Sequence, residues 1–259
     1  MEVVQRKVAI VTGASRESGI GTAICLELAK RGIDIFFTYY SDFDIDVGYN
    51  DANDNWHINL QNKITKLGVR CSSMSANYLD PMIVNKILDE TQRSLGLPSI
   101  LINNAAYCKA VDYKQVTTEI FKEHLDVNVL STCMLSVEFA KRFTGKLGGR
   151  IINLVSGQDK NPEVGNLPYS VSKGAMSTFT RTFALEVASL GITVNAVDPG
   201  PTDTGWMDED FKSELLLKFP SSRIGLPKDA AKAIGFLISQ EAERITGQII
   251  HSDGGFRGR

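Results

Sequence analysis

Short apolar runs, rich in β-branched residues, alternate with longer amphipathic stretches along the whole chain. Runs of this kind bounded by polar turns predict strands, and the longer stretches predict helices between them. Runs such as VAIV, ILI and IINLV are apolar at every position, which is typical of strands buried on both faces of a parallel sheet. The expected strands cover 7–12, 33–39, 69–74, 99–103, 150–155, 192–197 and 248–251, and the expected helices cover 20–31, 57–67, 80–95, 117–144, 169–190, 208–218 and 228–239.

This alternation predicts one α/β domain with a parallel seven-stranded sheet and helices on both of its faces. Gly32, Gly68, Gly96 and Gly191 each follow an expected helix, where a glycine can end it in the left-handed conformation. No linker rich in proline or serine divides the chain, so we expect a single doubly wound domain over 1–259.

Composition agrees with a folded, soluble protein that binds small molecules. The chain has 259 residues, 43% of them hydrophobic and 22% charged, which is enough to bury a large core. The net charge of -2, the pI near 6.0 and the lack of basic runs give no attraction to nucleic acid or to anionic membranes. A small neutral or anionic substrate is therefore expected.

The cysteines and histidines predict no metal site. The four cysteines form no CxxC pair, so free thiols in a reducing cytosol are expected rather than a zinc knuckle or a redox dithiol. His57, His124 and His251 lie in separate segments without ligand spacing. No signal-peptide core or membrane span is evident, so we expect a cytoplasmic protein.

A glycine-rich turn, TGASRESGIG, follows the first expected strand directly and leads into a helix. Gly13, Gly19 and Gly21 allow a tight turn and a close approach of a pyrophosphate to the helix N-terminus. A purely structural strand-to-helix turn is the alternative. The position after strand one favours a dinucleotide site.

The segment 41–56, SDFDIDVGYNDANDNW, interrupts the alternation with five aspartates and three asparagines. We interpret it as an insertion or long loop after the second strand. Two interpretations stay open, a solvated surface excursion and a flap near the adenosine end of a bound dinucleotide.

Tyr169 and Lys173 lie four residues apart, so they share one face of an expected helix. Ser156 precedes Tyr169 by thirteen residues and ends a strand, where ligands of open α/β sheets bind. Asn128 lies within an expected helix, where asparagine is a poor helix former and indicates either a function or a kink. A lone YxxxK is common by chance, but the combination points to a catalytic site.

These motifs resemble the TGxxxGxG turn and the Ser, Tyr and Lys signature of the short-chain dehydrogenase/reductase family, and the resemblance covers nearly the whole chain. It includes NNAA at 103–106, NAVDPGPTDT at 195–204, RIGLPKDAA at 223–231 and SDGG at 252–255. The strongest overall similarity is to bacterial enzymes of the 3-oxoacyl-[acyl-carrier-protein] reductase type. The turn is two residues longer than the family pattern between Gly13 and Gly19.

The resemblance implies a Rossmann-type fold and a catalytic tetrad of Asn128, Ser156, Tyr169 and Lys173. A phenol has an unperturbed pKa of about 10, so the Lys173 cation is needed to make Tyr169 an effective acid or base. Resemblance assigns Lys173 to the nicotinamide ribose and Asn128 to a proton-supplying water. The cofactor-binding residues that it implies are Gly13, Ser15, Arg16, Gly19, Ile20, Gly21, Tyr39, Tyr40, Asn77, Asn104, Ala105, Ala106, Tyr169, Lys173, Pro199, Gly200, Thr202 and Thr204.

The end of the second strand decides the cofactor. Tyr39 replaces the acidic residue that binds the adenosine ribose in NAD-preferring relatives, and Arg16 is a candidate partner for a 2′-phosphate. NADP(H) is therefore favoured, with NAD(H) the alternative if Asp42 or Asp44 folds back. Asn77 replaces a family aspartate, and its amide oxygen can still accept from adenine.

The favoured reaction interconverts a ketone and a secondary alcohol, with a 3-oxoacyl thioester on acyl carrier protein or CoA as the expected substrate. The segment 201–220 is the expected substrate flap, with Trp206 and Met207 as apolar contacts or as simple packing. Leu147 and Leu190 replace basic residues that meet the carrier in the family, although Lys146 and Arg150 lie near enough to substitute.

Two alternatives remain, a sugar or polyol dehydrogenase of the same family and a non-enzymatic cofactor sensor. A sensor has no physical need for the tetrad, which favours an enzyme. Resemblance also implies a homotetramer formed through the helices at 117–144 and 169–190. Their apolar faces suit this or intramolecular packing: Val127, Leu130, Met134 and Val137 on the first, and Phe179, Phe183 and Val187 on the second.

Overall fold

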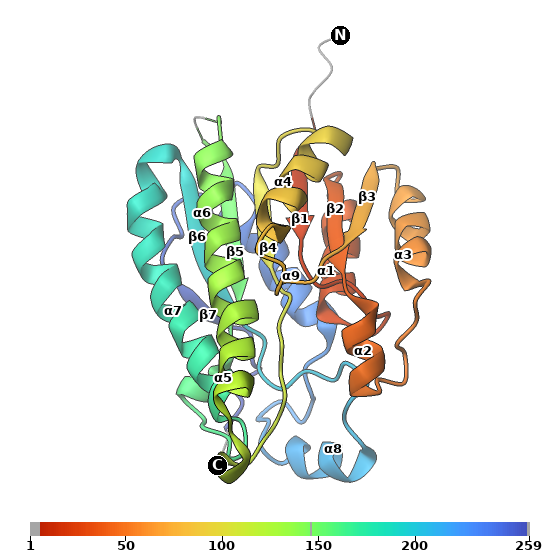
Figure 1. Ribbon diagram of the computed structural model, residues 1–259, viewed down its shortest axis with the longest axis vertical. Helices are drawn as coiled ribbons and strands as arrows, with labels where there is room; N and C mark the ends of the chain where they lie inside the picture. Colours follow the sequence, from red (N-terminus) through yellow and green to blue (C-terminus); the bar gives the residue numbers. More distant parts are fainter. Residues whose placement is uncertain (1–5, 146, 258–259) are drawn as a thin grey trace.

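The computed structural model describes residues 6–145 and 147–257, and the chain forms a three-layer α/β structure (Figure 1). Seven parallel strands form one sheet in the order β3-β2-β1-β4-β5-β6-β7. All seven expected strands are confirmed within two residues at their ends. They are β1 Val8–Val11, β2 Asp34–Tyr39, β3 Cys71–Ser75, β4 Ile100–Asn103, β5 Gly149–Leu154, β6 Ile192–Asp198 and β7 Ile249–His251.

Helices cover both faces of the sheet because successive strand residues point to opposite sides. Ala9 and Val11 pack into a cluster with residues of α1, α3 and α9, and Val8 and Ile10 pack into a second cluster with residues of α4, α6 and α7. The helices are α1 Ile20–Lys30, α2 Ser41–Val47, α3 Trp56–Thr65, α4 Ile83–Ser94, α5 Thr118–Leu125, α6 Thr132–Arg142, α7 Leu167–Val187, α8 Glu209–Leu216 and α9 Pro227–Leu237.

The strand order reverses between β1 and β4, which lie side by side although two strands separate them in sequence. In open α/β sheets a crevice forms at this point, outside the carboxyl ends of the strands. The glycine turn after β1 therefore faces a ready-made binding site.

Two elements differ from the expectation. The insertion contains a short helix, α2, which ends at Gly48 with φ 81°. The single helix expected over 117–144 is instead α5 and α6 joined by a π-helical turn, η2, at Asp126–Ser131. The four glycines expected to end helices all have positive φ, as predicted.

The expected apolar interface faces are also only partly exposed. Leu130 and Met134 are exposed, but Phe183 and Val187 are buried among the residues that pack under β5 and β6. These two side chains therefore belong to the core of the chain. Within the described part of the chain, no helix is long and apolar enough to span a bilayer.

Candidate active site

A cavity of about 330 Å³ opens at the carboxyl ends of β1, β2 and β4, beside the glycine turn. Five of the predicted cofactor residues do not line it: Tyr169 and Lys173 on α7, and Pro199, Gly200 and Thr202 directly after β6. The other predicted cofactor residues do line it: Gly13, Ser15, Arg16, Gly19, Ile20, Gly21, Tyr39, Tyr40, Asn77, Asn104, Ala105, Ala106 and Thr204.

The glycine turn is packed too closely for side chains. Gly13 has φ +73°, and a Cβ there would lie 2.7 Å from the Ala105 Cα atom. A Cβ at Gly21 would lie 2.3 Å from the Gly13 carbonyl oxygen. The side-chain amide of Asn104 donates to the Thr12 and Gly13 carbonyls, at 2.8 Å each, so Asn104 holds the turn against β4.

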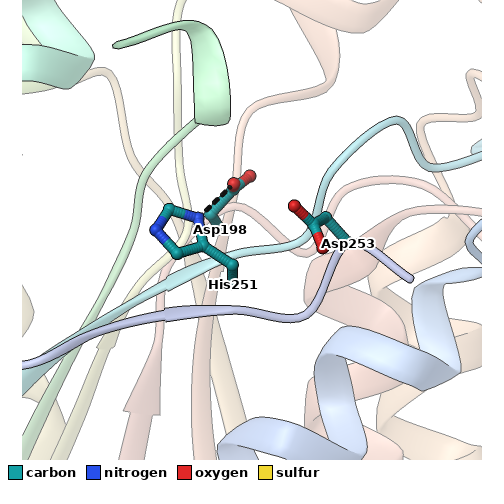
Figure 2. A group of neighbouring side chains, drawn as sticks. All are labelled: Asp198, His251 and Asp253. Atoms are coloured by element: carbon teal, nitrogen blue, oxygen red, sulfur yellow. Dashed lines mark hydrogen bonds and ion pairs between the residues drawn. The ribbon is translucent and has the colours of Figure 1, made fainter. Parts of the chain in front are cut away.

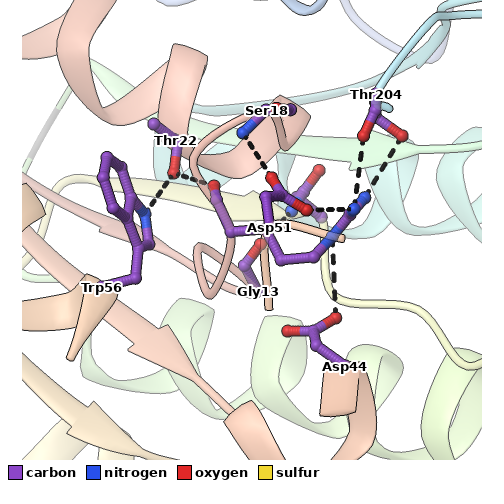
Figure 3. A network of polar contacts seen from close by, with 9 residues as sticks. Gly13, Ser18, Thr22, Asp44, Asp51, Trp56 and Thr204 are labelled. Atoms are coloured by element: carbon purple, nitrogen blue, oxygen red, sulfur yellow. Dashed lines mark hydrogen bonds and ion pairs between the residues drawn. The ribbon is translucent and has the colours of Figure 1, made fainter. Parts of the chain in front are cut away.

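Arg16 lies at the centre of a polar network that joins the turn to the insertion and to the segment after β6. Figure 3 labels its partners Asp44, Asp51 and Thr204. Its guanidinium donates to Asp51 Oδ1 at 2.8 Å, and to the Thr204 carbonyl and hydroxyl oxygens at 3.2 Å each. Asp44 Oδ1 lies 3.8 Å from Arg16 Nε, and the Tyr49 ring centroid lies 3.7 Å from Arg16 Cζ. Arg16 is thereby only 9% exposed.

Asp51 also contacts the backbone of the turn. Its Oδ2 accepts a hydrogen bond from the Ser18 amide at 2.9 Å, while its Oδ1 faces Arg16. Burial alone would raise the pKa of Asp51, but the Ser18 amide and the Arg16 charge outweigh it and lower that pKa. Burial raises the pKa of Asp44 despite a hydrogen bond from Ser15 and the charge of Arg16.

These contacts place part of the insertion 41–56 over the glycine turn. Asp44, which the sequence analysis named as able to fold back, does lie against Arg16 and lines the cavity. The other cavity-lining residues of the insertion were missed, because a high density of aspartates and aromatic residues does not specify which of them turn inward. The cavity-lining residues missed are Phe43 and Tyr49, together with Thr38, Ala76, Tyr78, Leu79, Tyr107 and Val127 from other segments.

The far end of the cavity, at the tips of β2 and β3, is aromatic. The Tyr39 ring stacks on His57 with centroids 4.2 Å apart. Asn77 Oδ1 accepts from the Leu79 amide at 2.9 Å, and Asn77 Nδ2 donates to the Tyr40 hydroxyl at 3.4 Å. The last residue of β2 is Tyr39 and not an acidic residue, as the sequence indicated.

Tyr169 and Lys173 lie one turn apart near the start of α7, which Pro168 helps to initiate. Lys173 Nζ lies 5.5 Å from the Tyr169 ring centroid and donates to the Leu154 carbonyl at 2.8 Å. Burial lowers the pKa of Lys173 to about 8, and burial raises the pKa of the Tyr169 phenol well above its ordinary value. At neutral pH the Tyr169 phenol is therefore protonated, while Lys173 still carries most of its positive charge.

Asn128 is 2% exposed and lies in the π-helical turn η2. Its Oδ1 accepts from the Tyr107 amide at 2.7 Å, and its Nδ2 donates to the Tyr107 carbonyl at 2.8 Å and to Ser172 Oγ at 2.9 Å. Ser172 Oγ in turn donates to the Tyr169 carbonyl at 2.7 Å. π-helical turns are frequent at functional sites, and this one connects the segment after β4 to the tyrosine helix.

Ser156 follows β5 in extended conformation, and Gly157 continues from it. A Cβ at Gly157 would lie 2.5 Å from Asp198 Oδ2, so Asp198 packs directly beneath this turn. Asp198 is buried and accepts from His251 Nδ1 at 2.8 Å, and Asp253 lies nearby (Figure 2). The ligand atoms of these three residues lie within 4.8 Å of one another, a grouping that sequence spacing did not reveal.

The segment after β6 closes the site from the other side. Thr202 is buried, and its hydroxyl hydrogen-bonds the Pro199 and Gly200 carbonyls, so it shapes the turn. Met207 is 6% exposed and packs with Leu215 and Phe219 in a small core.

This packing agrees with the second of the two alternatives given for Met207 and leaves it little surface for a ligand. Trp206 is 51% exposed, with its ring against Phe211, and remains available to a ligand.

The site thus combines a crevice beside the glycine turn with a buried lysine close to a phenol, and comparisons with known proteins agree with it. A family model described as enoyl-(acyl carrier protein) reductase matches residues 13–257. The chain is 48% identical over 254 residues to the uncharacterized oxidoreductase YjdA of Bacillus subtilis, covering 97% of each chain. It is 32% identical over 252 residues to the 3-oxoacyl-[acyl-carrier-protein] reductase FabG of Escherichia coli, covering 96% of each.

Among solved structures, a short chain dehydrogenase from Burkholderia cenocepacia in complex with NADP has a TM-score of 0.85 at 30% identity. The match covers 97% of this chain and 98% of that one. The chain belongs to the short-chain dehydrogenase/reductase family. It is an oxidoreductase that acts on CH–OH groups, as the tetrad predicted.

Proposed function

We propose that the protein is an NADP(H)-dependent carbonyl reductase whose substrate is a 3-oxoacyl thioester or a similar small ketone. The observation that carries this proposal is the pairing of Tyr169 with the buried Lys173, beside a crevice whose glycine turn has no room for side chains. The similarity to carrier-protein reductases supports the choice of substrate class.

The cavity suits a dinucleotide. The glycine turn presents backbone amides at the start of α1, and the aromatic end at Tyr39 and Tyr40 offers flat surfaces to a base. When bound, the reduced cofactor supplies the hydride for the carbonyl carbon. NADP(H) is supported by the structural relatives that contain NADP or NADPH and by the absence of an acidic residue at Tyr39.

The tetrad residues have separate roles in this proposal. The Tyr169 phenol donates its proton to the oxygen that develops negative charge, and the Ser156 hydroxyl stabilises the same oxygen. Lys173 binds ribose hydroxyls, and its charge lowers the pKa of Tyr169 when the site is filled. Asn128 acts by fixing the Tyr107 backbone and the Ser172 hydroxyl beneath the site.

Asp51 competes with a cofactor phosphate for Arg16 in this arrangement. The Asp51→Asn variant keeps an acceptor for the Ser18 amide but removes the negative charge that holds the guanidinium. We expect NADPH to bind about 3–10-fold more tightly, with a smaller change for NADH, in fluorescence titrations.

The matched control is Asp54→Asn, because Asp54 is exposed in the same segment and forms no ion pair within the described part of the chain. Equal changes for both cofactors, or none, would show that Asp51 only holds the insertion in place.

The carrier protein is the less favoured form of the substrate. Leu147 is 84% exposed where family carrier-protein reductases have a basic residue. Arg150, which was expected to substitute, is 4% exposed, so its charge does not reach the surface. Lys146 lies outside the described residues. We therefore propose a free or CoA-linked 3-oxo substrate ahead of a carrier-bound one.

The experiment that tests the function is NADPH oxidation by the purified protein with a panel of substrates. The panel holds 3-oxoacyl-CoA, 3-oxoacyl carrier protein, a 3-oxo ester, an enoyl-CoA and several polyols with NADP⁺. Turnover of the 3-oxo compounds supports the proposal. Activity confined to polyols or to the enoyl thioester would replace it with another reaction of the family, and cofactor binding without any turnover would favour a sensor.

We further propose a cytoplasmic homotetramer. Leu130 and Met134 on the η2–α6 segment and Leu185 on α7 are exposed, and the two helices pack side by side (Figure 1). Replacing Leu185, which is 79% exposed, with Glu should place charges in the contact and dissociate the assembly.

Size-exclusion chromatography with light scattering would measure this, with Leu217→Glu as the control because Leu217 is at least as exposed and lies on a different segment, after α8. A wild-type monomer, or an unchanged Leu185→Glu tetramer, would contradict the assignment of this interface.

A further inference from the structure

A second cavity, of about 600 Å³, lies at the amino end of the sheet. It is lined by Lys7, which precedes β1, by Arg150 at the start of β5 and by Thr193 at the start of β6. The strands are parallel, so this edge is opposite to the one that carries the glycine turn and the tetrad. No residue lines both cavities.

The charge around this cavity is not balanced. Lys7, Arg150 and Arg244 line it, and Glu243 is the one carboxylate among its described lining residues. None of these four side chains is within ion-pair distance of an opposite charge in the described chain. Burial and the Arg150 charge lower the pKa of Lys7, which indicates that two cations face the same space. The Glu243 charge acts on Arg150 and offsets only part of this positive charge.

Two buried polar atoms at the cavity lack hydrogen-bond partners. Arg150 is 4% exposed, and its two terminal nitrogens donate to the Gly149 and Ser239 carbonyls, but its Nε has no acceptor. Thr193 is 7% exposed, and its hydroxyl is also without a partner. An unpartnered buried donor on a charged group costs free energy, and a bound acceptor would remove this cost.

We propose that this cavity is a second binding site, remote from the catalytic centre, for a phosphate-type oxyanion. The Arg150 Nε–H and the Thr193 hydroxyl are covered in the free chain, so both side chains turn toward the cavity to donate to the oxygens of the ligand. Lys7 and Arg244 balance its charge. A phosphate group suits this set because it accepts several hydrogen bonds and carries between one and two negative charges at neutral pH. The ligand is inorganic phosphate or the phosphate group of a small metabolite.

The test uses the full chain and measures thermal unfolding and calorimetric binding with inorganic phosphate, at ionic strength held constant with chloride. A parallel titration with glycerol 3-phosphate separates free phosphate from a phosphate monoester. We expect millimolar ligand to raise the Tm by about 2–4 °C. Tighter binding of the monoester would identify a metabolite as the ligand, and tighter binding of phosphate would identify the free ion.

Variants at exposed positions locate the ion, because phosphate can also bind at the glycine turn. Glu243→Gln removes the cavity's carboxylate and should tighten binding about 3–10-fold, whereas Lys7→Gln and Arg244→Gln should each weaken it by a similar factor. Arg150→Lys, which keeps the charge but lacks the Nε–H, is a fourth variant. Arg93→Gln is the control, since Arg93 is exposed on α4 and paired with Glu90.

Two results would overturn the proposal. One is the absence of any phosphate-dependent shift in Tm. The other is a shift that is the same in the Glu243, Lys7 and Arg244 variants, which would place the ion elsewhere. Neither result bears on the proposed reductase activity, because the cavity shares no residue with that site.

Discussion

Replacement of Tyr169 by Phe is expected to lower kcat by about 10²–10⁴-fold while the affinity for NADPH stays close to normal. The phenylalanine ring fills the same space at the start of α7 but has no proton to donate. Burial raises the pKa of the Tyr169 phenol, so the group is fully protonated in the free protein and begins a reduction as the acid. Steady-state kinetics with the best 3-oxo substrate and fluorescence titration of NADPH would measure the two quantities.

A conservative control for this variant is Tyr113→Phe, because Tyr113 is 70% exposed and lies outside the cavity. It loses the same atom and should retain wild-type kcat. Turnover by Tyr169→Phe at the level of this control would remove Tyr169 from the mechanism and leave the assignment of the whole tetrad without support.

Replacement of Lys173 by Met is expected to lower both kcat and cofactor affinity, each by about 10-fold or more, because the ammonium is assigned two roles. Methionine has a similar length, so it preserves packing under the site but removes the charge. The same titrations and kinetics measure both effects, with the exposed Lys30→Met as control. A loss of kcat with unchanged affinity for NADPH would show that Lys173 does not contribute to cofactor binding.

The same substitution should change the pH dependence of stability. Burial lowers the pKa of Lys173 to about 8, from 10.5, so between these values the unfolded chain binds a proton that the folded chain has released. Stability linked to this group therefore increases as the pH rises from 8 to 10.5 and is lowest below 8.

Urea unfolding across this range should show that increase in the wild type and lack it in Lys173→Met. An identical slope in both proteins would show that Lys173 stays charged in the fold.

Much of the fold could be predicted from sequence because the informative patterns are local. A strand such as VAIV, apolar on both faces, has few environments other than the centre of a parallel sheet. Tyr169 and Lys173 are brought together by the helical repeat alone, and the glycines of the turn have a steric requirement that the structure shows directly.

The missed features depend on long-range contacts. The insertion is rich in Asp and Asn, which disfavour helix interiors, yet it forms α2 and places Asp44 and Asp51 against Arg16. Met207 packs into a small core with Leu215 and Phe219. The periodicity of the sequence does not predict this packing. The only indication of the π-helical turn in the sequence was Asn128, because asparagine is a poor helix former.

One side chain, Arg16, joins three segments that are distant in sequence: the glycine turn, the insertion through Asp51, and the segment after β6 through Thr204. Changes in any one of these segments will therefore alter how the other two are held. Substitutions at Asp51 and Thr204 should not have additive free-energy effects, although their positions differ by more than 150 residues in the chain. Any variation in the acidic insertion is thus also a variation in how the segment after β6 is held.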